Sequence, residues 1–141
     1  MNNPEVRKTM KTKILLVDDE AVLTRMMKRN FEATGRFEVL DINDSHIAVD
    51  AARRFRPDVA LLDIMMPGVD GNDLAAAFAS DPHLADIPII FLTATISKTA
   101  VEPSGSKVGN YTFLAKPVTF DDVLACINGL LGTVGTVNEF V

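Results

Sequence analysis

Short apolar segments that alternate with amphipathic helical segments constrain the fold of this chain most strongly. The segments predicted as strands are KILLV at 13–17, FEVLDI at 37–42, VALLD at 59–63, IPIIFL at 87–92 and YTFLA at 111–115. Strands that are apolar throughout are typical of parallel sheets whose two faces are both covered. Right-handed crossovers place the intervening helices on both faces. The sequence therefore predicts an α/β fold of five βα units around a five-stranded parallel sheet.

Helical periodicity predicts helices over 20–34, 46–55, 72–79 and from 119 onward. Ser45 is predicted to cap the second of these helices, and Thr119 with Asp122 three residues later resembles a capping box for the last one. The stretch 95–110 is less regular, because Pro103 and Gly105 break a helix. We expect a short helix around Ser97–Val101 at most, followed by a loop or a small extended segment.

Composition limits the classes of partner. The chain has 141 residues, a net charge of −5 and a single cysteine, which fits one domain without an internal disulfide. Basic residues are scattered and form no patch of the kind that a nucleic-acid surface requires. No apolar run approaches the roughly 18 residues of a membrane span. We therefore expect a cytoplasmic protein with no membrane segment and no direct nucleic-acid binding.

Polar side chains follow four of the predicted strands, at the point where each strand ends. They are Asp18 and Asp19, Asp63, Thr93 and Lys116. Parallel sheets place their chemistry at the carboxyl ends of the strands, so these residues should converge on one pocket. Three carboxylates, an ammonium and a hydroxyl suit a divalent cation and a phosphoryl group. Each residue alone has a simpler explanation, such as a helix cap or a solvated turn, and only their joint placement favours a functional site.

The segments ILLVDDE, PDVALLDIMMPGVDG, PIIFLTA and FLAKP occur in this order, and with them the sequence resembles the receiver domain of bacterial two-component response regulators. The resemblance covers about residues 12–132, which we expect to form the domain, with flexible termini at 1–11 and 133–141. It implies a flavodoxin-like, doubly wound sheet with strand order 2-1-3-4-5. The stretch after Thr93 departs from the family pattern, so we expect an irregular, shortened fourth helix.

The resemblance also implies roles for the residues of the pocket. Asp63 would accept a phosphoryl group from a sensor histidine kinase or a histidine phosphotransferase. Asp18, Asp19, Asp63 and the backbone carbonyl of Met65 would hold Mg²⁺ or Mn²⁺. The chain would act as a signalling switch that turns over only its own aspartate, and not as an enzyme on other substrates.

Three further residues are implicated in the switch. Lys116 would contact the phosphoryl group, with a cis bond to Pro117. Thr93 would move toward the phosphoryl group, and Phe113 matches the aromatic residue that changes rotamer with it. An ordinary core aromatic is an equally good explanation of Phe113. The altered surface would be read by a protein partner that the sequence does not identify, and a homodimer is one form that this output can take.

Other functions remain open from the residues alone. The chain can be a switch that signals to a target protein, an intermediate or phosphate sink in a phosphorelay, or a receiver cut from a larger regulator. A phosphatase with an aspartate nucleophile usually has a second aspartate two residues later. This chain has Met65 there, which argues against turnover of small substrates. A flavin- or nucleotide-binding module would need a phosphate-binding loop after the first strand. This chain has VDDEAV there, which is acidic, lacks glycine and would repel phosphate without a cation.

Overall fold

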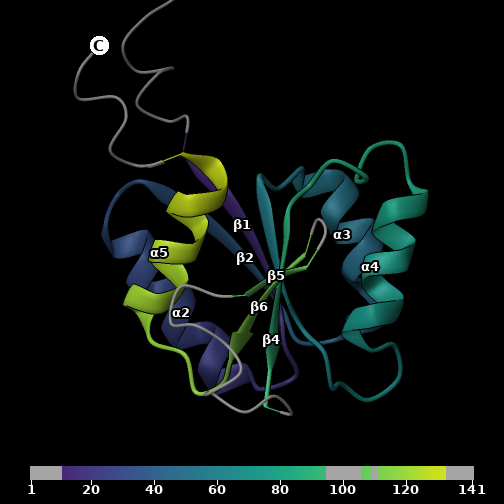
Figure 1. Cartoon of the computed structure of the whole chain (residues 1–141), viewed down its shortest axis with the longest axis horizontal. Helices are drawn as coiled ribbons and strands as arrows, with labels where there is room; N and C mark the ends of the chain where they lie inside the picture. Colours follow the sequence, from purple (N-terminus) through teal and green to yellow (C-terminus); the bar gives the residue numbers. More distant parts are fainter. Residues whose placement is uncertain (1–10, 95–105, 109–110, 133–141) are drawn as a thin grey trace, which may run out of the picture.

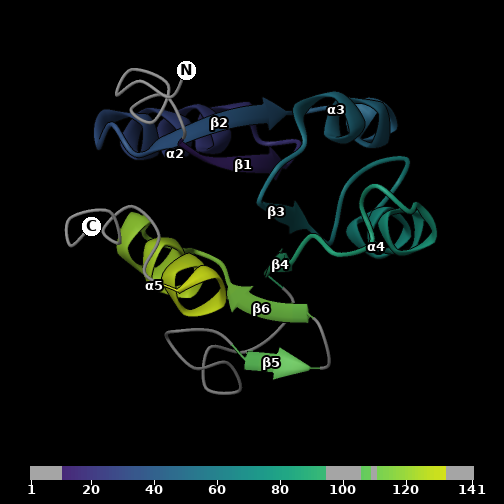
Figure 2. The same cartoon turned by 90° about the horizontal axis from the view of Figure 1, so that it is seen from above.

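The computed structural model describes residues 11–94, 106–108 and 111–132. Five strands of the sheet are parallel and lie in the spatial order β2-β1-β3-β4-β6. The sheet and its order along the molecule can be followed in Figure 2. The parallel strands are β1 (Thr12–Val17), β2 (Phe37–Ile42), β3 (Val59–Asp63), β4 (Ile89–Thr93) and β6 (Tyr111–Ala115). This arrangement confirms the doubly wound fold and the predicted strand order.

A sixth strand was not predicted as such. β5 (Ser106–Val108) pairs antiparallel with β6 at the edge of the sheet. It falls where we expected a loop or a small extended segment. The short fourth helix expected around Ser97–Val101 lies outside the described residues, and so do the expected flexible termini apart from Lys11.

Helices cover both faces of the sheet (Figure 1). α2 (Ala21–Ala33) and α5 (Phe120–Leu131) lie on one face, and α3 (Ala48–Phe55) and α4 (Gly71–Ser80) lie on the other. The expected capping box of α5 is present, because the Thr119 side chain accepts from the Asp122 backbone and Asp122 accepts in return. Among the described residues, no helix has the length and apolar character needed to cross a membrane.

The predicted cap at Ser45 is wrong. A short 3-10 turn, η1 (Ser45–Ile47), precedes α3, and Asp44 caps it by accepting a hydrogen bond from the His46 backbone. Asp and Ser are comparable capping residues, and the chain uses the one that stands a residue earlier. The fourth strand also begins later than predicted, because Ile87 closes a turn by donating to the Leu84 carbonyl.

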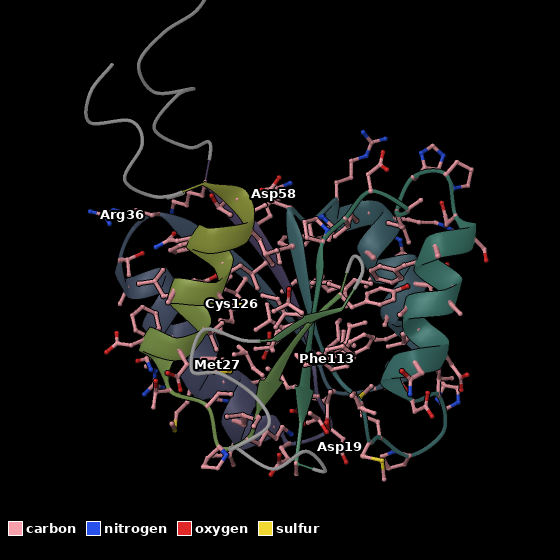
Figure 3. All side chains as sticks on the ribbon, viewed as in Figure 1. Asp19, Met27, Arg36, Asp58, Phe113 and Cys126 are labelled. Carbon is pink, nitrogen blue, oxygen red and sulfur yellow. The ribbon has the colours of Figure 1, made fainter. Side chains whose placement is uncertain are left out.

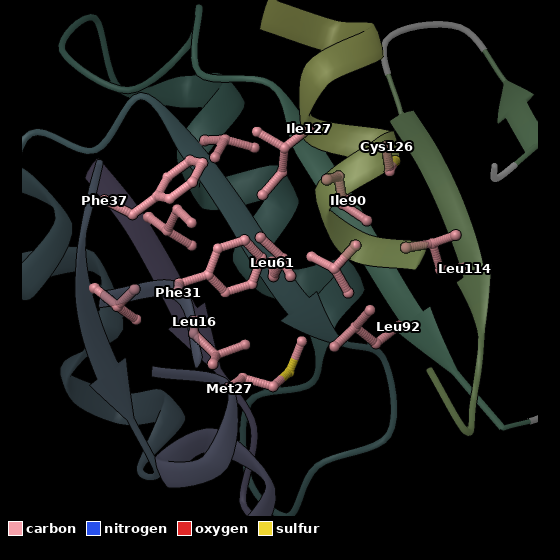
Figure 4. Close-up of a cluster of buried hydrophobic side chains, with 14 residues drawn as sticks. Leu16, Met27, Phe31, Phe37, Leu61, Ile90, Leu92, Leu114, Cys126 and Ile127 are labelled. Atoms are coloured by element: carbon pink, nitrogen blue, oxygen red, sulfur yellow. The ribbon is translucent and has the colours of Figure 1, made fainter. Parts of the chain in front are cut away.

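Alternate side chains of the buried strands enter two hydrophobic layers. One layer, on the side of α2 and α5, is drawn in Figure 4 and includes Phe31, which packs edge-on against Phe37 and Phe120. The other layer, on the side of α3 and α4, contains Phe78 and Phe91. Burial of both faces explains why the central strands β3 and β4 carry no polar side chain until their carboxyl ends.

Candidate functional site

The end of β1 places two carboxylates in different environments. Asp18 is fully buried, whereas Asp19 is exposed. The Asp18 carboxylate accepts a hydrogen bond from the Glu20 backbone at 2.9 Å. The Asn43 side chain fixes the Asp18 backbone by donating to its carbonyl at 2.7 Å. Asp18 is therefore held rigidly, while Asp19 faces solvent at the carboxyl end of the sheet (Figure 3).

The end of β3 places Asp63 beside this pair. Its side chain is nearly buried and accepts a hydrogen bond from the Met65 backbone at 3.3 Å. The start of α4 comes very close to the strand end, because Gly71 donates to the Ile64 carbonyl at 3.0 Å. A Cβ atom on Gly71 would lie 2.5 Å from the Asp63 carbonyl oxygen. The glycine thus permits the tight turn that presents Asp63.

The three predicted carboxylates converge. Asp18, Asp19 and Asp63 each offer an oxygen, and these atoms all lie within 4.8 Å of one another. Oxygen ligands gathered in this way at the carboxyl ends of the strands fit Mg²⁺, which keeps several waters and takes few protein ligands. The geometry therefore supports the expected metal site, with a buried side and an exposed side.

Lys116 extends from the end of β6 into the same site. Its Nζ lies 2.8 Å from an Asp18 oxygen, 3.0 Å from Glu20 and 3.4 Å from Asp63. The peptide bond from Lys116 to Pro117 is cis, as the resemblance implied. The ammonium thus sits among three carboxylates, and Asp63 is the most distant of them.

Two ionisable groups of the site are perturbed. Burial raises the pKa of Asp63 to about 6, the Asp18 carboxylate adds to the rise, and Lys116 opposes it. Burial by itself lowers the pKa of Lys116, but hydrogen bonds to Asp18 and Glu20 and the charges of Asp18 and Asp63 outweigh this effect, so its pKa lies above the ordinary value. Crowded negative charge is therefore the dominant electrostatic feature of the site.

The remaining predicted residues lie near the site in different ways. Thr93 is fully buried at the end of β4, and its carbonyl accepts a hydrogen bond from the Lys116 backbone at 2.8 Å. Phe113 is half-buried and stacks on Phe91 with ring centroids 5.1 Å apart. Phe113 packs against the hydrophobic layer on the side of α3 and α4. The Met65 side chain is exposed.

Sequence reasoning missed two residues of the site. Asn43 joins β1 to α2 by donating to both the Asp18 carbonyl and the Thr24 hydroxyl. Glu20 contacts Lys116 at 3.0 Å. The only signal for Glu20 was its place directly after the two aspartates, and an acid there is equally typical of a helix N-terminus.

The comparisons with known proteins agree with this geometry. A family model described as the response regulator receiver domain matches residues 14–128. Among solved structures, chemotaxis protein CheY4 of Vibrio cholerae superposes with a TM-score of 0.73 at 26% identity, over 86% of this chain and 99% of that one. The receiver domain of Francisella response regulator 1452 has a TM-score of 0.69 at 27% identity, over 85% and 96% of the two chains.

Curated relatives are longer. The probable transcriptional regulatory protein TcrX of Mycobacterium tuberculosis is 34% identical over 124 residues, which cover 86% of this chain and 50% of TcrX. The DNA-binding response regulator MtrA of Mycobacterium bovis is 33% identical over 123 residues, covering 87% and 52%. This chain thus spans about half the length of these relatives. Because the name of MtrA describes a DNA-binding protein, the comparisons give no support to our expectation that nucleic acid is not bound.

Proposed function

The chain belongs to the response regulator receiver domain family, and on this premise we propose that Asp63 accepts a phosphoryl group from a sensor histidine kinase or a histidine phosphotransferase. Receiver domains are signalling switches and not conventional enzymes. The convergence of Asp18, Asp19 and Asp63, with the Lys116 ammonium in contact with Asp18 and Asp63, carries this proposal. Residues from the ends of three strands meet at one point, and each supplies a group that phosphoryl transfer uses.

Asp63 is the nucleophile. A carboxylate oxygen of Asp63 forms the new bond to phosphorus, while the bond from phosphorus to the donor nitrogen breaks and the nitrogen keeps the electron pair. Asp63 is suited to this role because one of its oxygens is oriented by the hydrogen bond from the Met65 backbone. Asp18 is fully buried and Asp63 is not, so Asp63 is the more accessible of the two inner carboxylates.

The acidic cluster would hold Mg²⁺ or Mn²⁺ through Asp18, Asp19, Asp63 and the backbone carbonyl of Met65. When bound, the cation neutralises charge on the carboxylates and on the transferring group. The chain supplies the site by burying Asp18, which fixes one ligand, and by leaving Asp19 toward solvent, where entry is open. Burial and, to a lesser extent, the Asp18 charge raise the pKa of Asp63, and a bound cation would favour the charged carboxylates by offsetting both effects.

Lys116 and Thr93 would stabilise the added charge. The phosphoryl group brings a charge of about −1.5 to −2 at neutral pH, which attracts the Lys116 ammonium 3.4 Å from Asp63. Thr93 ends the strand next to β3, where Asp63 pairs with Leu92. Movement of the Thr93 hydroxyl and of Phe113 would then change the surface that a protein partner reads.

The mass of the intact protein after incubation with acetyl phosphate and Mg²⁺ tests the proposal. We expect an adduct of about 80 Da, one phosphoryl group, on the native chain and none on Asp63→Asn. Asp58→Asn is the matched control, because Asp58 lies at the opposite end of the sheet from Asp19 (Figure 3). Labelling of Asp63→Asn at the native level would place the acceptor elsewhere.

Two other roles of the chain remain as alternatives to a target-binding switch. In one, the chain is a phosphorelay intermediate or a phosphate sink. In the other, it is a receiver within a larger regulator, in which further domains carry the output. The lifetime of the adduct separates a sink, which loses the group quickly, from a switch, which retains it. Partner binding before and after phosphorylation, with any homodimer among the outcomes, tests the output.

A further inference from the structure

Glu20 has an unusual use of its side chain. It stands directly before the first turn of α2, where short polar residues normally cap the helix, but its side chain makes no capping hydrogen bond. Its Oε1 instead accepts a hydrogen bond from Lys116 Nζ at 3.0 Å. Its backbone is fixed by donation to Asp18 at 2.9 Å. Glu20 therefore contributes to the site through Lys116 and not through the helix.

The competition for Lys116 favours Glu20 over Asp63. The ammonium is 3.0 Å from Glu20 but 3.4 Å from Asp63. Within the described residues, Glu20 is not one of the carboxylates that gather closely enough to share a cation. A cation in the cluster would weaken the attraction of Asp18 and Asp63 for the ammonium and leave that of Glu20 largely intact. Glu20 is then the strongest remaining competitor.

We propose that Glu20 is a positioning residue that holds Lys116 in its resting place and opposes the contact of Lys116 with a phosphoryl group on Asp63. This inference rests on the proposed function of Asp63. It assigns Glu20 the role of setting the balance between the resting and the phosphorylated arrangement. A cleft of about 400 Å³ lies beside Glu20 and is lined also by Leu23, Pro117 and Val118. It leaves room for the Glu20 side chain once Lys116 has moved away from it.

Beryllium fluoride, which mimics a phosphoryl group on a carboxylate, provides the test. We expect its affinity in the presence of Mg²⁺, followed by fluorine NMR, to be about two- to five-fold higher for Glu20→Gln than for the native chain, the size of effect of a partly exposed ion pair. The affinity for Mg²⁺ alone should not rise, since a nearby negative charge is lost. Structural damage would weaken the binding of both beryllium fluoride and Mg²⁺. A gain in beryllium fluoride affinity without a gain in Mg²⁺ affinity therefore cannot come from damage to the fold.

Two further variants identify the cause. Glu20→Asp keeps the charge but is one methylene shorter, so it should lose the contact with Lys116 and bind beryllium fluoride as Glu20→Gln does. Glu38→Gln removes an exposed charge on β2 and should bind as the native chain does. Native-like binding by Glu20→Asp would mean that Glu20 acts by general repulsion of the anion, and would overturn the proposal.

The outcomes for this inference and for the proposed function are distinguishable. Native binding that is lost in Asp63→Asn supports the function of Asp63. If that result holds and Glu20→Gln shows no gain in beryllium fluoride affinity, only the role of Glu20 fails. If the native chain shows no binding that depends on Asp63, both proposals fail.

Discussion

Asp18 and Lys116 are 98 residues apart in the chain and form a 2.8 Å ion pair. Asp18 is fully buried, and a buried carboxylate is costly unless it is paired and hydrogen-bonded. Lys116 and the Glu20 backbone supply these partners. The pair therefore joins the ends of β1 and β6, and the site exists only when the whole sheet has formed.

Asp63 makes the stability of the metal-free protein depend on pH. Its pKa in the folded state is about 6, above the ordinary value of 3.8. The folded state thus binds more protons than the unfolded state between about pH 4 and pH 6, and stability falls as the pH rises through this window. We expect Asp63→Asn to be more stable than the native chain above pH 6, by about 1–2 kcal/mol after solvent screening, with no gain below pH 4.

Urea unfolding in EDTA at pH 4 and pH 7.5 measures this difference. Asp58→Asn serves as the control, because its carboxylate accepts a backbone hydrogen bond from Lys13 instead of repelling another acid. We expect no gain in stability from this control at either pH. A gain for Asp63→Asn that was the same at both pH values would contradict the electrostatic explanation.

Metal addition should reverse the effect of Asp63 on stability. A cation that binds only the folded state stabilises it by about 2.7 kcal/mol at 100 times its dissociation constant. We expect Mg²⁺ to raise the melting temperature of the native chain at pH 7.5, and EDTA to lower it again. Asp19→Asn should lose most of this response without a loss of metal-free stability, because Asp19 is exposed. An unchanged response in Asp19→Asn would remove it from the ligand set.

The strands and the predicted cluster were accessible from the sequence for a physical reason. Strands covered on both faces must be apolar along their length, so the first polar residue after each strand marks its carboxyl end. Asp18, Asp63 and Lys116 were placed together in this way. Glu20 and Asn43 were not, because their partners depend on side-chain directions at a strand end, which residue spacing does not determine.

The cap at Asp44 and the strand β5 were missed for another reason. Asp44 and Ser45 are neighbours with similar capping ability, and the choice between them depends on where the turn after β2 begins. β5 has only three residues, Ser106–Val108, and follows a stretch rich in turn-forming residues. So short a segment has too little periodicity to distinguish a strand from a loop.

Gly71 tests whether the close contact between α4 and β3 matters for Asp63. An alanine Cβ there would lie 2.5 Å from the Asp63 carbonyl oxygen and 2.9 Å from the Ile64 Cα, and backbone atoms cannot move aside easily. We expect Gly71→Ala to lower stability by about 1–3 kcal/mol and to slow labelling by acetyl phosphate, as measured by urea unfolding and intact mass.

Gly129→Ala is the matched control for this substitution. Gly129 lies within α5, and a Cβ there meets nothing within 4 Å. Alanine is the better helix former, so we expect a gain of about 0.5–1 kcal/mol with no change in labelling. Equal stability changes in the two variants would show that the contact at Gly71 is not a tight one.

Two buried threonines differ in how their hydroxyls are satisfied. Thr112 on β6 is buried and, within the described part of the chain, its hydroxyl has no hydrogen-bond partner. The Thr24 hydroxyl on α2 donates to the Ala21 carbonyl and accepts from Asn43. A buried hydroxyl without a partner is costly, whereas removal of a satisfied one leaves its partners unpaired.

We therefore expect valine, which has the same shape, to act in opposite directions at the two sites. Thr112→Val should raise the free energy of unfolding by about 1 kcal/mol, and Thr24→Val should lower it by about 1–3 kcal/mol. Urea unfolding of both variants at one pH makes the comparison. A loss of stability in Thr112→Val would show that its hydroxyl does have a partner, such as a bound water, and the difference between the two sites would then disappear.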